Sequence, residues 1–332
     1  MPWKGEKDPY KIWLSEIILQ QTRVEQGLKY YNDFVANYPT ISDLARAPER
    51  ELLKRWEGLG YYSRCRNLIS TARFIHEKRE GKFPDTYEEI LSLKGVGPYT
   101  AAAISSFAYQ LPHAVVDGNV FRVLARVFGI KTPTDSPEGK KYFTALADSL
   151  LDRRQPGIYN QAIMDFGATV CKPVAPLCST CPFQKNCIAF QQKEINAYPV
   201  KGKKITMKKR NFFYLVISYR GRYAIRQRKA KDIWRGLYEF PNIESGTSLT
   251  GKKIFAQAVK EKWIVPAQFV AGPISDLYKQ QLTHQQITAR FQQIRLKKKP
   301  ATGDWQWVLP SEWPQFAFPR LFREYNQTLF RP

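Results

Sequence analysis

The chain has 332 residues, and its 52 Lys and Arg against 29 Asp and Glu give a formal net charge of +23. This length suggests two domains, and 43% hydrophobic with 14% aromatic residues exclude a disordered chain. No apolar run approaches the roughly 18–20 residues of a membrane span, and the opening residues lack the apolar segment of a secretory signal. Four of the five cysteines lie between Cys171 and Cys187, unlike a disulfide framework. We therefore expect a reducing, cytoplasmic setting.

The positive charge is spread over the whole chain. Residues 1–210 carry 32 basic and 21 acidic side chains, and residues 211–332 carry 20 and 8. A field of this sign attracts polyanions and steers them to the surface, so nucleic acid is the leading partner. An anionic membrane would call for a basic amphipathic helix or a lipid anchor, and neither stands out. A charge that serves only solubility is the remaining alternative.

Residues 9–190 have the apolar periodicity of helices joined by short connections. Asp8-Pro9 begins the first helix with a capping side chain and a proline in the first turn. Further helices are predicted at 42–58, 63–80, 86–93, 98–109, 119–128, 138–152 and 157–170. Residues 191–210 are polar and lysine-rich without helical periodicity, and we interpret them as a basic linker.

Beyond this linker the periodicity changes to that of strands. Residues 211–219 and 223–228 flank Arg220-Gly221-Arg222, which predicts a β-hairpin. Further strands are predicted at 269–275, 285–296 and 305–309, with a helix near 252–263. The expected architecture is a mainly α domain over 1–190, the linker at 191–210 and an α+β domain over 211–332.

Four cysteines form the strongest motif, Cys171-x6-Cys178-x2-Cys181-x5-Cys187. Three interleaved prolines hold a compact loop at 171–187, in which the thiols can converge on one centre. Thiolates are the ligands of soft metals, and four cysteines suit both zinc and a 4Fe–4S cluster. Unconnected free cysteines are the alternative, so the motif predicts a metal centre without choosing its metal.

The segment Leu93–Ala101, LKGVGPYTA, predicts a tight turn between two helices. Gly95 and Gly97 let the backbone approach a partner closely, and Pro98 starts the next helix. The free N–H groups of that helix start suit a phosphate. These are the properties of a helix–hairpin–helix clamp that grips the DNA backbone without reading sequence. A purely structural turn is the alternative, and the net charge favours DNA.

Glu16 lies in a helix whose apolar residues cover nearly the whole circumference. Such a helix is buried, and burial raises the pKa of a carboxyl group. Glu16 is therefore a candidate proton donor near neutral pH, or a structural partner of a nearby Arg. Asp117, in AVVDGNVFRVL, is either a helix N-cap or the partner of Glu16, with one carboxyl protonated and the other ionised as in glycoside chemistry.

These segments together resemble one family, the adenine DNA glycosylases of the MutY type within the helix–hairpin–helix glycosylase superfamily. The resemblance runs from residue 2 to the C-terminus, densely in the first domain and sparsely in the second. The matching stretches are PWK at 2–4, DPYKIWLSEIILQQTRV at 8–24, WEGLGYYSRCRNL at 56–68, LKGVGPYTA at 93–101, VVDGNVFRVLARVF at 115–128, the four-cysteine loop and WRGLYEFP at 234–241.

The resemblance implies a base-excision repair enzyme that removes adenine mispaired with 8-oxoguanine or guanine in double-stranded DNA, after the base is extruded from the helix. It implies that Glu16 is the general acid that protonates the adenine. Asp117 would be the carboxylate that stabilises the oxocarbenium-like sugar or transiently bonds to it. Tyr99 and Asn119 would hold these two carboxyl groups in place.

The resemblance also implies the cofactor and the DNA contacts. The cysteine loop matches the family's 4Fe–4S cluster, one per chain, which supports DNA docking and is not the catalyst. Gln20 matches a residue that wedges into the base stack, and Tyr61-Tyr62 lie where an aromatic ring intercalates beside the lesion. Trp3 and Asp165 lie in the stretches that match the adenine pocket.

One family feature bears on the reaction type. Related glycosylases that also cut the strand, such as endonuclease III, carry a nucleophilic lysine in the hairpin segment, where this chain has Tyr99. No amine at this position can form a Schiff base. We therefore predict a monofunctional glycosylase that leaves an abasic site.

The second domain resembles the family's Nudix-like module. The acidic box of Nudix hydrolases should follow WRGLYEFP, but Glu261 is the only acidic residue between 246 and 262, so pyrophosphate hydrolysis is not expected. Relatives sense 8-oxoguanine through a Phe-Ser-His loop, and the matching residues here are Leu282, Thr283 and His284. The hydroxyl and the imidazole are kept, whereas the aromatic ring is replaced by Leu; a structural role for the lone histidine is the alternative.

The chain departs from the family at two further places. Relatives usually carry a helix before the Pro-Trp motif, whereas this sequence starts at Met1-Pro2-Trp3. Asp165 stands where relatives commonly have Glu. The competing functions are a thymine- or oxidised-base glycosylase of the same superfamily and a non-catalytic damage-binding protein. We expect a monomer, associated with the nucleoid if bacterial.

Overall fold

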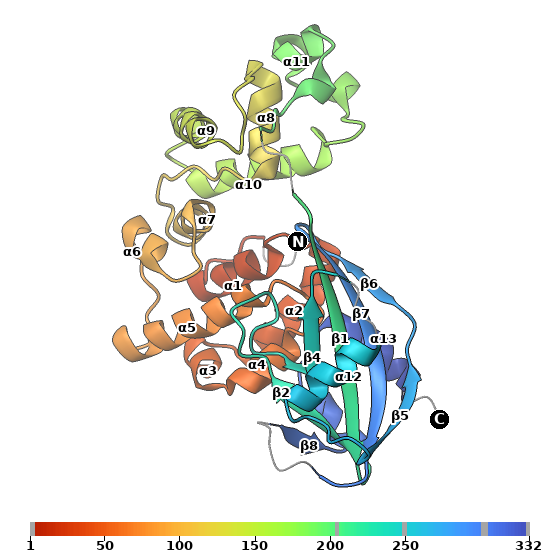
Figure 1. Ribbon diagram of the computed structural model, residues 1–332. Coiled ribbons are helices and arrows are strands. Elements are labelled where there is room, and N and C mark those ends of the chain that lie inside the picture. Colours follow the sequence, from red (N-terminus) through yellow and green to blue (C-terminus); the bar gives the residue numbers. More distant parts are fainter. Residues whose placement is uncertain (1–3, 203–205, 248–250, 300–304, 330–332) are drawn as a thin grey trace. The chain divides into compact units, whose positions relative to one another are not determined.

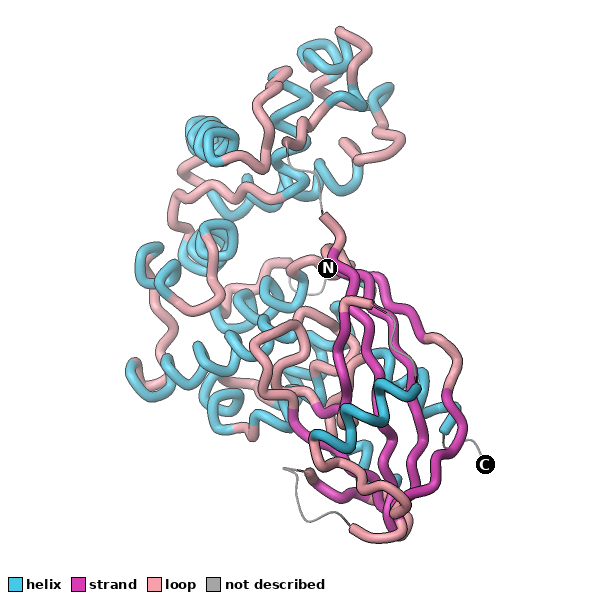
Figure 2. The backbone as a smooth tube through the Cα atoms, viewed as in Figure 1, coloured by secondary structure: helices cyan, strands magenta, loops and turns pink. Residues whose placement is uncertain are grey.

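The computed structural model describes residues 4–202, 206–247, 251–299 and 305–329. They form two compact units, coloured along the chain in Figure 1. Unit 1 comprises Met1–Arg46 and Asn67–Lys204, and unit 2 comprises Ala47–Arg66 and Ile205–Pro332. Unit 1 is helical and unit 2 contains the strands (Figure 2), which confirms the predicted fold class. None of the helices among these residues is both long and apolar enough to cross a bilayer.

Unit 1 is built from short helices, as the periodicity predicts. The α-helices that lie wholly within it are α1 (Pro9–Leu19), α2 (Val24–Asn37), α3 (Ile41–Arg46), α6 (Tyr87–Ser92), α7 (Pro98–Tyr109), α8 (Gly118–Phe128), α9 (Pro137–Leu150), α10 (Pro156–Thr169) and α11 (Ile188–Gln191). Helix α5 (Tyr62–Lys78) begins in unit 2 and continues into unit 1. One hydrophobic core forms where α8 packs with α9, around Leu124 and Phe143.

The predicted single helix at 42–58 is wrong, because the chain breaks it in the middle. Helix α3 ends at Arg46, and α4 (Glu49–Arg55) begins after Pro48. A proline has no N–H to donate, and its ring disfavours helical backbone in the residue before it. Pro48 instead has the extended backbone of a helix N-cap, with φ −61° and ψ 132°.

Unit 2 is built on one eight-stranded sheet with the strand order β3-β2-β1-β7-β5, to which β4, β6 and β8 add at β1, β7 and β2. The strands are β1 (Lys208–Tyr219), β2 (Arg222–Gln227), β3 (Tyr238–Glu239), β4 (Asn242–Ser245), β5 (Phe269–Ile274), β6 (Tyr278–Gln281), β7 (Gln285–Leu296) and β8 (Gln306–Val308). The predicted hairpin is confirmed: β1 and β2 pair antiparallel, and the turn residues Arg220 and Gly221 have φ of 47° and 73°, as a tight two-residue hairpin turn requires.

Alternation along β1 gives the sheet two buried faces. Phe213, Leu215 and Ile217 join one core, together with Ile254 and Ala258 of α12 (Gly251–Lys260). Tyr214 points to the other face, which is aromatic. There its ring lies 5.1 Å from that of Phe291 and 4.6 Å from that of Phe322 on α13 (Arg320–Leu329). Figure 1 shows α12 and α13 with the sheet.

Strand β1 also pairs in parallel with β7, from Lys208 opposite Gln285 to Ser218 opposite Arg295. This pairing fixes the start of β7 against the start of β1. The three residues before β7, Leu282 to His284, are therefore held at a defined edge of the sheet.

Candidate active site

The four residues predicted to form the catalytic centre all line one cavity of unit 1. This cavity has a volume of about 880 Å³ and is lined by residues that include Glu16, Tyr99, Asp117 and Asn119. Glu16 comes from α1, Tyr99 from the first turn of α7, and the other two from the start of α8. Side chains from three helices, far apart in the sequence, thus meet at one solvent-filled space.

Glu16 is buried, with 8% of its surface exposed, because α1 is apolar on all sides. Desolvation raises its pKa to about 7, and the negative charge of Asp117 adds to the rise, while a hydrogen bond from the Tyr99 hydroxyl opposes it. Among the described residues no basic side chain contributes to this pKa, so the structural alternative of an arginine partner is not supported. A carboxyl group of this kind can donate a proton near neutral pH.

Asp117 is held in a fixed orientation by three hydrogen bonds. As the N-cap of α8, its Oδ1 accepts from the backbone N–H groups of Asn119 and Val120, both at 2.8 Å. Its Oδ2 accepts from Nδ2 of Asn119 at 2.7 Å. The N-cap interpretation is therefore confirmed, and it is compatible with a catalytic role, because the capped carboxylate also lines the cavity.

Sequence reasoning missed Arg122, which lies one turn after Asn119 on α8. Its guanidinium donates to Oδ1 of Asn119 at 2.8 Å and to the carbonyl oxygens of Gly167 and Cys171 at 2.6 and 2.7 Å. It thereby connects the group that holds Asp117 to the start of the cysteine loop. The available signal was a lone arginine in the otherwise apolar run VFRVL, which needs buried acceptors.

Of the two residues assigned to the adenine pocket, the structure describes Asp165. Asp165 lines the cavity, where it accepts a hydrogen bond from Gln161 at 3.0 Å and pairs with the ammonium group of Lys4. Trp3 lies outside the described residues. Gln20, the predicted wedge, is at the C-terminal end of α1, lines the same cavity and donates to the Thr100 hydroxyl at 3.3 Å.

The four cysteines of the loop line a second, small cavity of unit 1. Arg126 of α8 lies beside them and donates to the carbonyl oxygen of Lys172 at 2.7 Å. In the part of the chain that the structure describes, no set of three or more His, Cys, Asp or Glu side chains is placed to hold a metal ion. Cys65, the fifth cysteine, is buried in unit 2.

A third cavity, of about 620 Å³, lies within unit 2 and brings together two separately predicted segments. It is lined by Gly58–Ser63 from the first segment and Lys279–Gln285 from the second. The Tyr61 hydroxyl lies 2.7 Å from the Thr283 hydroxyl, although 222 positions separate them. Tyr61 is 43% exposed, whereas Tyr62 is 5% exposed and its hydroxyl accepts from the Gly58 N–H. Tyr61 is therefore the ring of this pair that reaches solvent.

Comparisons with known proteins identify the family. A model of the HhH-GPD superfamily of base excision DNA repair proteins matches residues 14–146, and a NUDIX domain model matches residues 213–328. The adenine DNA glycosylase of Buchnera aphidicola subsp. Schizaphis graminum is 35% identical over 245 residues, which cover 74% of this chain and 71% of the relative. This chain belongs to the adenine DNA glycosylase family. It is therefore a DNA N-glycosylase of base-excision repair.

Another adenine DNA glycosylase and two solved structures are also similar to this chain. The human adenine DNA glycosylase is 43% identical over 203 residues, covering 58% of this chain and 37% of the relative. A thermostable thymine-DNA glycosylase is 32% identical with a TM-score of 0.54, covering 58% of this chain and 88% of that chain. An endonuclease III–DNA complex, 23% identical with a TM-score of 0.50, covers 57% and 86% and shows the fold alone.

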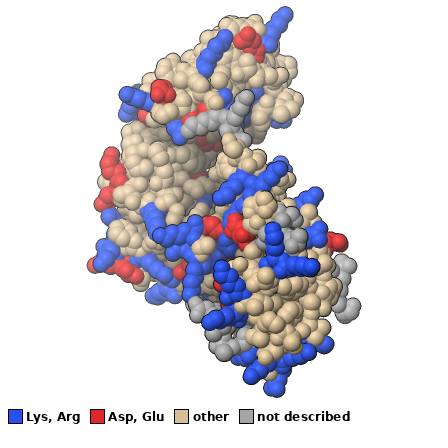
Figure 3. All heavy atoms as spheres, viewed as in Figure 1, with Lys and Arg blue, Asp and Glu red and all other residues tan. Residues whose placement is uncertain are grey.

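In this member of the adenine DNA glycosylase family, the predicted clamp lies at the start of α7. Gly95 has φ +84°, and a Cβ there would lie 2.7 Å from Cβ of Asn67, so only glycine fits this turn. Gly97 is the N-cap of α7 and faces open space, which leaves its backbone accessible to a phosphate. Lys and Arg side chains also gather over unit 2 on the face drawn in Figure 3.

Proposed function

We propose that this glycosylase hydrolyses the N-glycosidic bond of adenine opposite 8-oxoguanine or guanine and leaves an abasic site. The observation that carries the proposal is the pair of carboxyl groups on one cavity, with the pKa of Glu16 raised to about 7 and Asp117 held by three donors. The names of the relatives support adenine as the excised base.

The chemistry follows from the different surroundings of the two carboxyl groups. Adenine, extruded from the duplex, enters the cavity, and protonated Glu16 gives it a proton while the bond between the base and C1′ breaks. The bonding electron pair leaves with the base. The carboxylate of Asp117 stabilises the positive charge that develops on the sugar, either by its field or by transient bonding at C1′. Water then adds at C1′ and gives up a proton to the carboxylate of Glu16, which yields the abasic sugar and restores the acid.

Tyr99 and Asn119 are positioning residues in this scheme. The Tyr99 hydroxyl donates to Glu16, and the Asn119 amide orients Asp117. Position 99 offers no amine for a Schiff base. Lys7 also lines the cavity, but its ammonium group donates to the carbonyl oxygen of Phe107 at 3.2 Å. We therefore propose a monofunctional enzyme.

The cysteine loop offers four thiols around one small cavity, a donor set that suits a 4Fe–4S cluster. The likeness to the adenine DNA glycosylases favours the cluster over a single zinc ion. We propose that Cys171, Cys178, Cys181 and Cys187 hold the cluster as its thiolate ligands. Bound there, the cluster would fix the loop for docking on DNA and take no part in base release.

We further propose that Tyr61, Thr283 and His284 recognise the 8-oxoguanine opposite the adenine. The exposed Tyr61 ring suits stacking beside the lesion, and the Thr283 hydroxyl and the exposed His284 imidazole offer hydrogen bonds. Leu282 supplies no ring for stacking. Gly95, Gly97 and Gln20 are the proposed backbone and stacking contacts, and a monomer in the cytoplasm remains our prediction.

A substrate comparison tests this proposal. Single-turnover base release is measured on duplexes that contain adenine opposite 8-oxoguanine, guanine or thymine, and thymine opposite guanine. The proposal predicts release in the order adenine opposite 8-oxoguanine, then opposite guanine, with none from the other two duplexes. The resemblance to a thymine-DNA glycosylase makes the fourth duplex informative, because thymine release there would contradict the assignment of adenine.

A further inference from the structure

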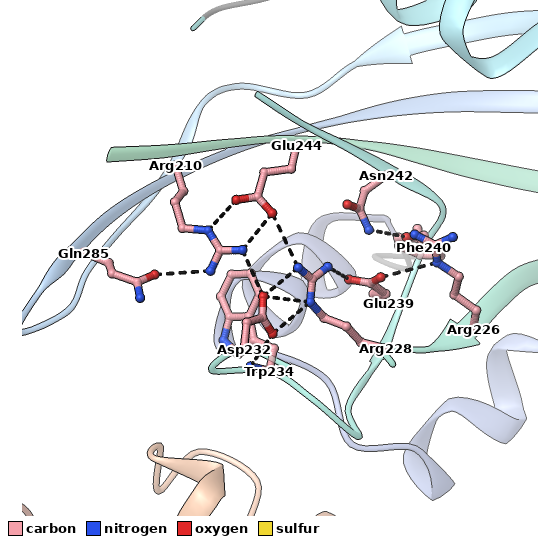
Figure 4. A network of polar contacts seen from close by, with 10 residues as sticks. All are labelled: Arg210, Arg226, Arg228, Asp232, Trp234, Glu239, Phe240, Asn242, Glu244 and Gln285. Atoms are coloured by element: carbon pink, nitrogen blue, oxygen red, sulfur yellow. Dashed lines mark hydrogen bonds and ion pairs between the residues drawn. The ribbon is translucent and has the colours of Figure 1, made fainter. Parts of the chain in front are cut away.

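A network of paired charges, in which Arg210, Arg228 and Glu239 are buried, lies in unit 2 next to the cavity that holds Tyr61 and Thr283. Three arginines and three carboxylates alternate in it (Figure 4), so their formal charges cancel. We call this the arginine–carboxylate network; its members are Arg210, Arg226, Arg228, Asp232, Glu239 and Glu244. Because each carboxylate is paired with arginine, the network does not offer the free carboxylates that a Nudix magnesium site needs.

Arg210, on β1, is held by two carboxylates of this network. Its guanidinium binds both carboxylate oxygens of Glu244 at 2.6 and 2.7 Å, and Asp232 at 2.9 Å. Its side chain is 8% exposed. A planar guanidinium held by two carboxylates has its remaining N–H groups fixed in direction.

One of these N–H groups contacts Gln285, the residue that follows the turn Leu282–His284, which we call the recognition loop. Nη1 of Arg210 donates to Oε1 of Gln285 at 3.3 Å, and Figure 4 shows this contact at the side of the network away from Arg228. Gln285 is the residue after His284 and lines the same cavity as Tyr61. Arg210 thus places a charged donor against the Gln285 side chain.

The loop itself is a tight turn, in which the Thr283 hydroxyl contacts that of Tyr61 and the Leu282 carbonyl accepts from the Gln281 amide. The Leu282 N–H donates to the Gln285 carbonyl at 2.8 Å, and the Lys208 N–H donates to the His284 carbonyl at 2.9 Å. Both are backbone contacts, which set the path of the chain. The Arg210–Gln285 contact adds a side-chain hydrogen bond at the end of the turn, directly after Thr283 and His284 in the sequence.

The same network also supports the opposite wall of the cavity. Asp232, which binds Arg210, accepts a hydrogen bond from the Trp234 N–H at 3.1 Å. Trp234 lines the cavity and packs on Phe212, with ring centroids 5.3 Å apart. Arg210 therefore contacts Gln285 directly and Trp234 through Asp232. Gln285 and Trp234 both line the cavity that holds Tyr61 and Thr283, which we call the recognition cavity.

We propose that Arg210 and Gln285 are positioning residues for 8-oxoguanine preference: they hold the Leu282–His284 turn in the orientation in which its side chains meet the lesion. This inference rests on the proposed function, because it concerns how the second unit distinguishes 8-oxoguanine from guanine. The two residues touch neither the adenine nor the reacting sugar. Their effect is therefore expected on discrimination between the duplexes and not on the chemical step.

The test uses Gln285→Leu in the full chain, which removes the acceptor oxygen at similar volume and leaves the ion pairs of Arg210 intact. Single-turnover rates and binding constants are measured on duplexes with adenine opposite 8-oxoguanine and opposite guanine. The preference for 8-oxoguanine is the ratio of the value on the 8-oxoguanine duplex to the value on the guanine duplex. It is expected to fall about fivefold, with the values on the guanine duplex nearly unchanged. Gln285→Glu keeps an oxygen acceptor for Arg210 and is expected to retain the preference.

Gln292→Leu is the matched control. Gln292 lies on the same strand and donates to the Gly272 carbonyl at 2.7 Å, away from the recognition cavity, so its loss should leave the ratio unchanged. A wild-type preference that Gln285→Leu leaves intact, or an equal loss on both duplexes, would overturn this inference alone. A wild-type chain with no preference for 8-oxoguanine would overturn the proposed recognition function and this inference with it.

Discussion

At the scale of single residues, the account depends on two carboxyl groups in unlike surroundings. Glu16 is enclosed by the apolar side chains of α1 and is close to no cation among the described residues, so its neutral form is favoured. Asp117 accepts three N–H bonds, which suits an ionised carboxylate. In the proposed mechanism, this difference in environment assigns Glu16 as the acid and Asp117 as the stabilising anion.

The first prediction concerns pH. Because Glu16 must be protonated to act and its pKa is about 7, the rate of adenine release should fall about tenfold per pH unit above that value. Tyr99→Phe removes a hydrogen bond that lowers this pKa, so the falling limb should move to higher pH. Single-turnover rates between pH 6 and 9 check both statements; a rate that is flat over this range, or a limb that moves to lower pH in the variant, would contradict them.

The second prediction separates the two functions of Asp117. Asp117→Asn keeps an oxygen that can cap α8 but loses the charge, so the free energy of unfolding should change little while base release falls at least about 100-fold. Asp117→Ala should lose both the helix cap and the charge, and the lost cap should lower the free energy of unfolding by about 1 kcal/mol. Urea unfolding and single-turnover assays measure the two effects. Near-normal base release by Asp117→Asn would show that Asp117 acts only as the N-cap of α8.

The sequence predicted Glu16 because an ionisable side chain in an all-apolar helix is visible without a structure. It could not predict the contacts of Arg122 with Gly167 and Cys171, since these acceptors are backbone carbonyls brought close only by the packing of α8 and α10. The pairing of Lys4 with Asp165 likewise depends on tertiary structure. Residue identity indicated the chemistry, and packing decided the partners.

At the scale of elements, the two glycines of the hairpin before α7 have different physical requirements. Gly95→Ala should cost about 1–2 kcal/mol, because φ is +84° and the new methyl group would meet Asn67. Gly97→Ala meets nothing within 4 Å, so stability should be kept while affinity for undamaged duplex falls about fivefold. Thermal unfolding and DNA titration test this. Unchanged affinity in Gly97→Ala would contradict a backbone clamp at this turn.

The arginine–carboxylate network should make unit 2 sensitive to acid. Burial opposes ionisation of Asp232, but hydrogen bonds from Arg228 and Arg210 outweigh it and lower its pKa to about 2. A lowered pKa means that stabilisation is complete above the ordinary value near 4 and is lost as pH falls toward about 2. Asp232→Asn should therefore cost about 2 kcal/mol at pH 7 and less at pH 3. Asp276→Asn, at an exposed site, is the control; an equal cost at both pH values would contradict the network's role.

Element prediction succeeded where periodicity was long and unbroken. Residues 98–109 and 285–296 were predicted with the bounds that α7 and β7 have. Strands β3 and β4, of two and four residues, are too short to show alternation and were missed, as was α13 with its aromatic core residues. The break at Pro48 was missed because the apolar pattern continues through it.

At the scale of the whole molecule, two chemical tasks are assigned to two compact units. The carboxyl pair and the cysteine loop belong to unit 1, and the recognition cavity belongs to unit 2. The segment 47–66 belongs to the same compact unit as the C-terminal residues, and Tyr61 meets Thr283 within it. Sequence spacing could not predict this meeting, since 222 positions separate the two residues and Tyr61 falls within the predicted first domain.

The most direct test of the central claim uses one duplex with a single adenine opposite 8-oxoguanine. The strands are examined for breaks with and without alkali, for the wild-type chain and for Glu16→Gln. The account predicts a break in the adenine strand only after alkali, and none with the variant, which should still bind the duplex. A break without alkali would contradict the monofunctional mechanism, and full base release by Glu16→Gln would contradict the role of Glu16 as the acid.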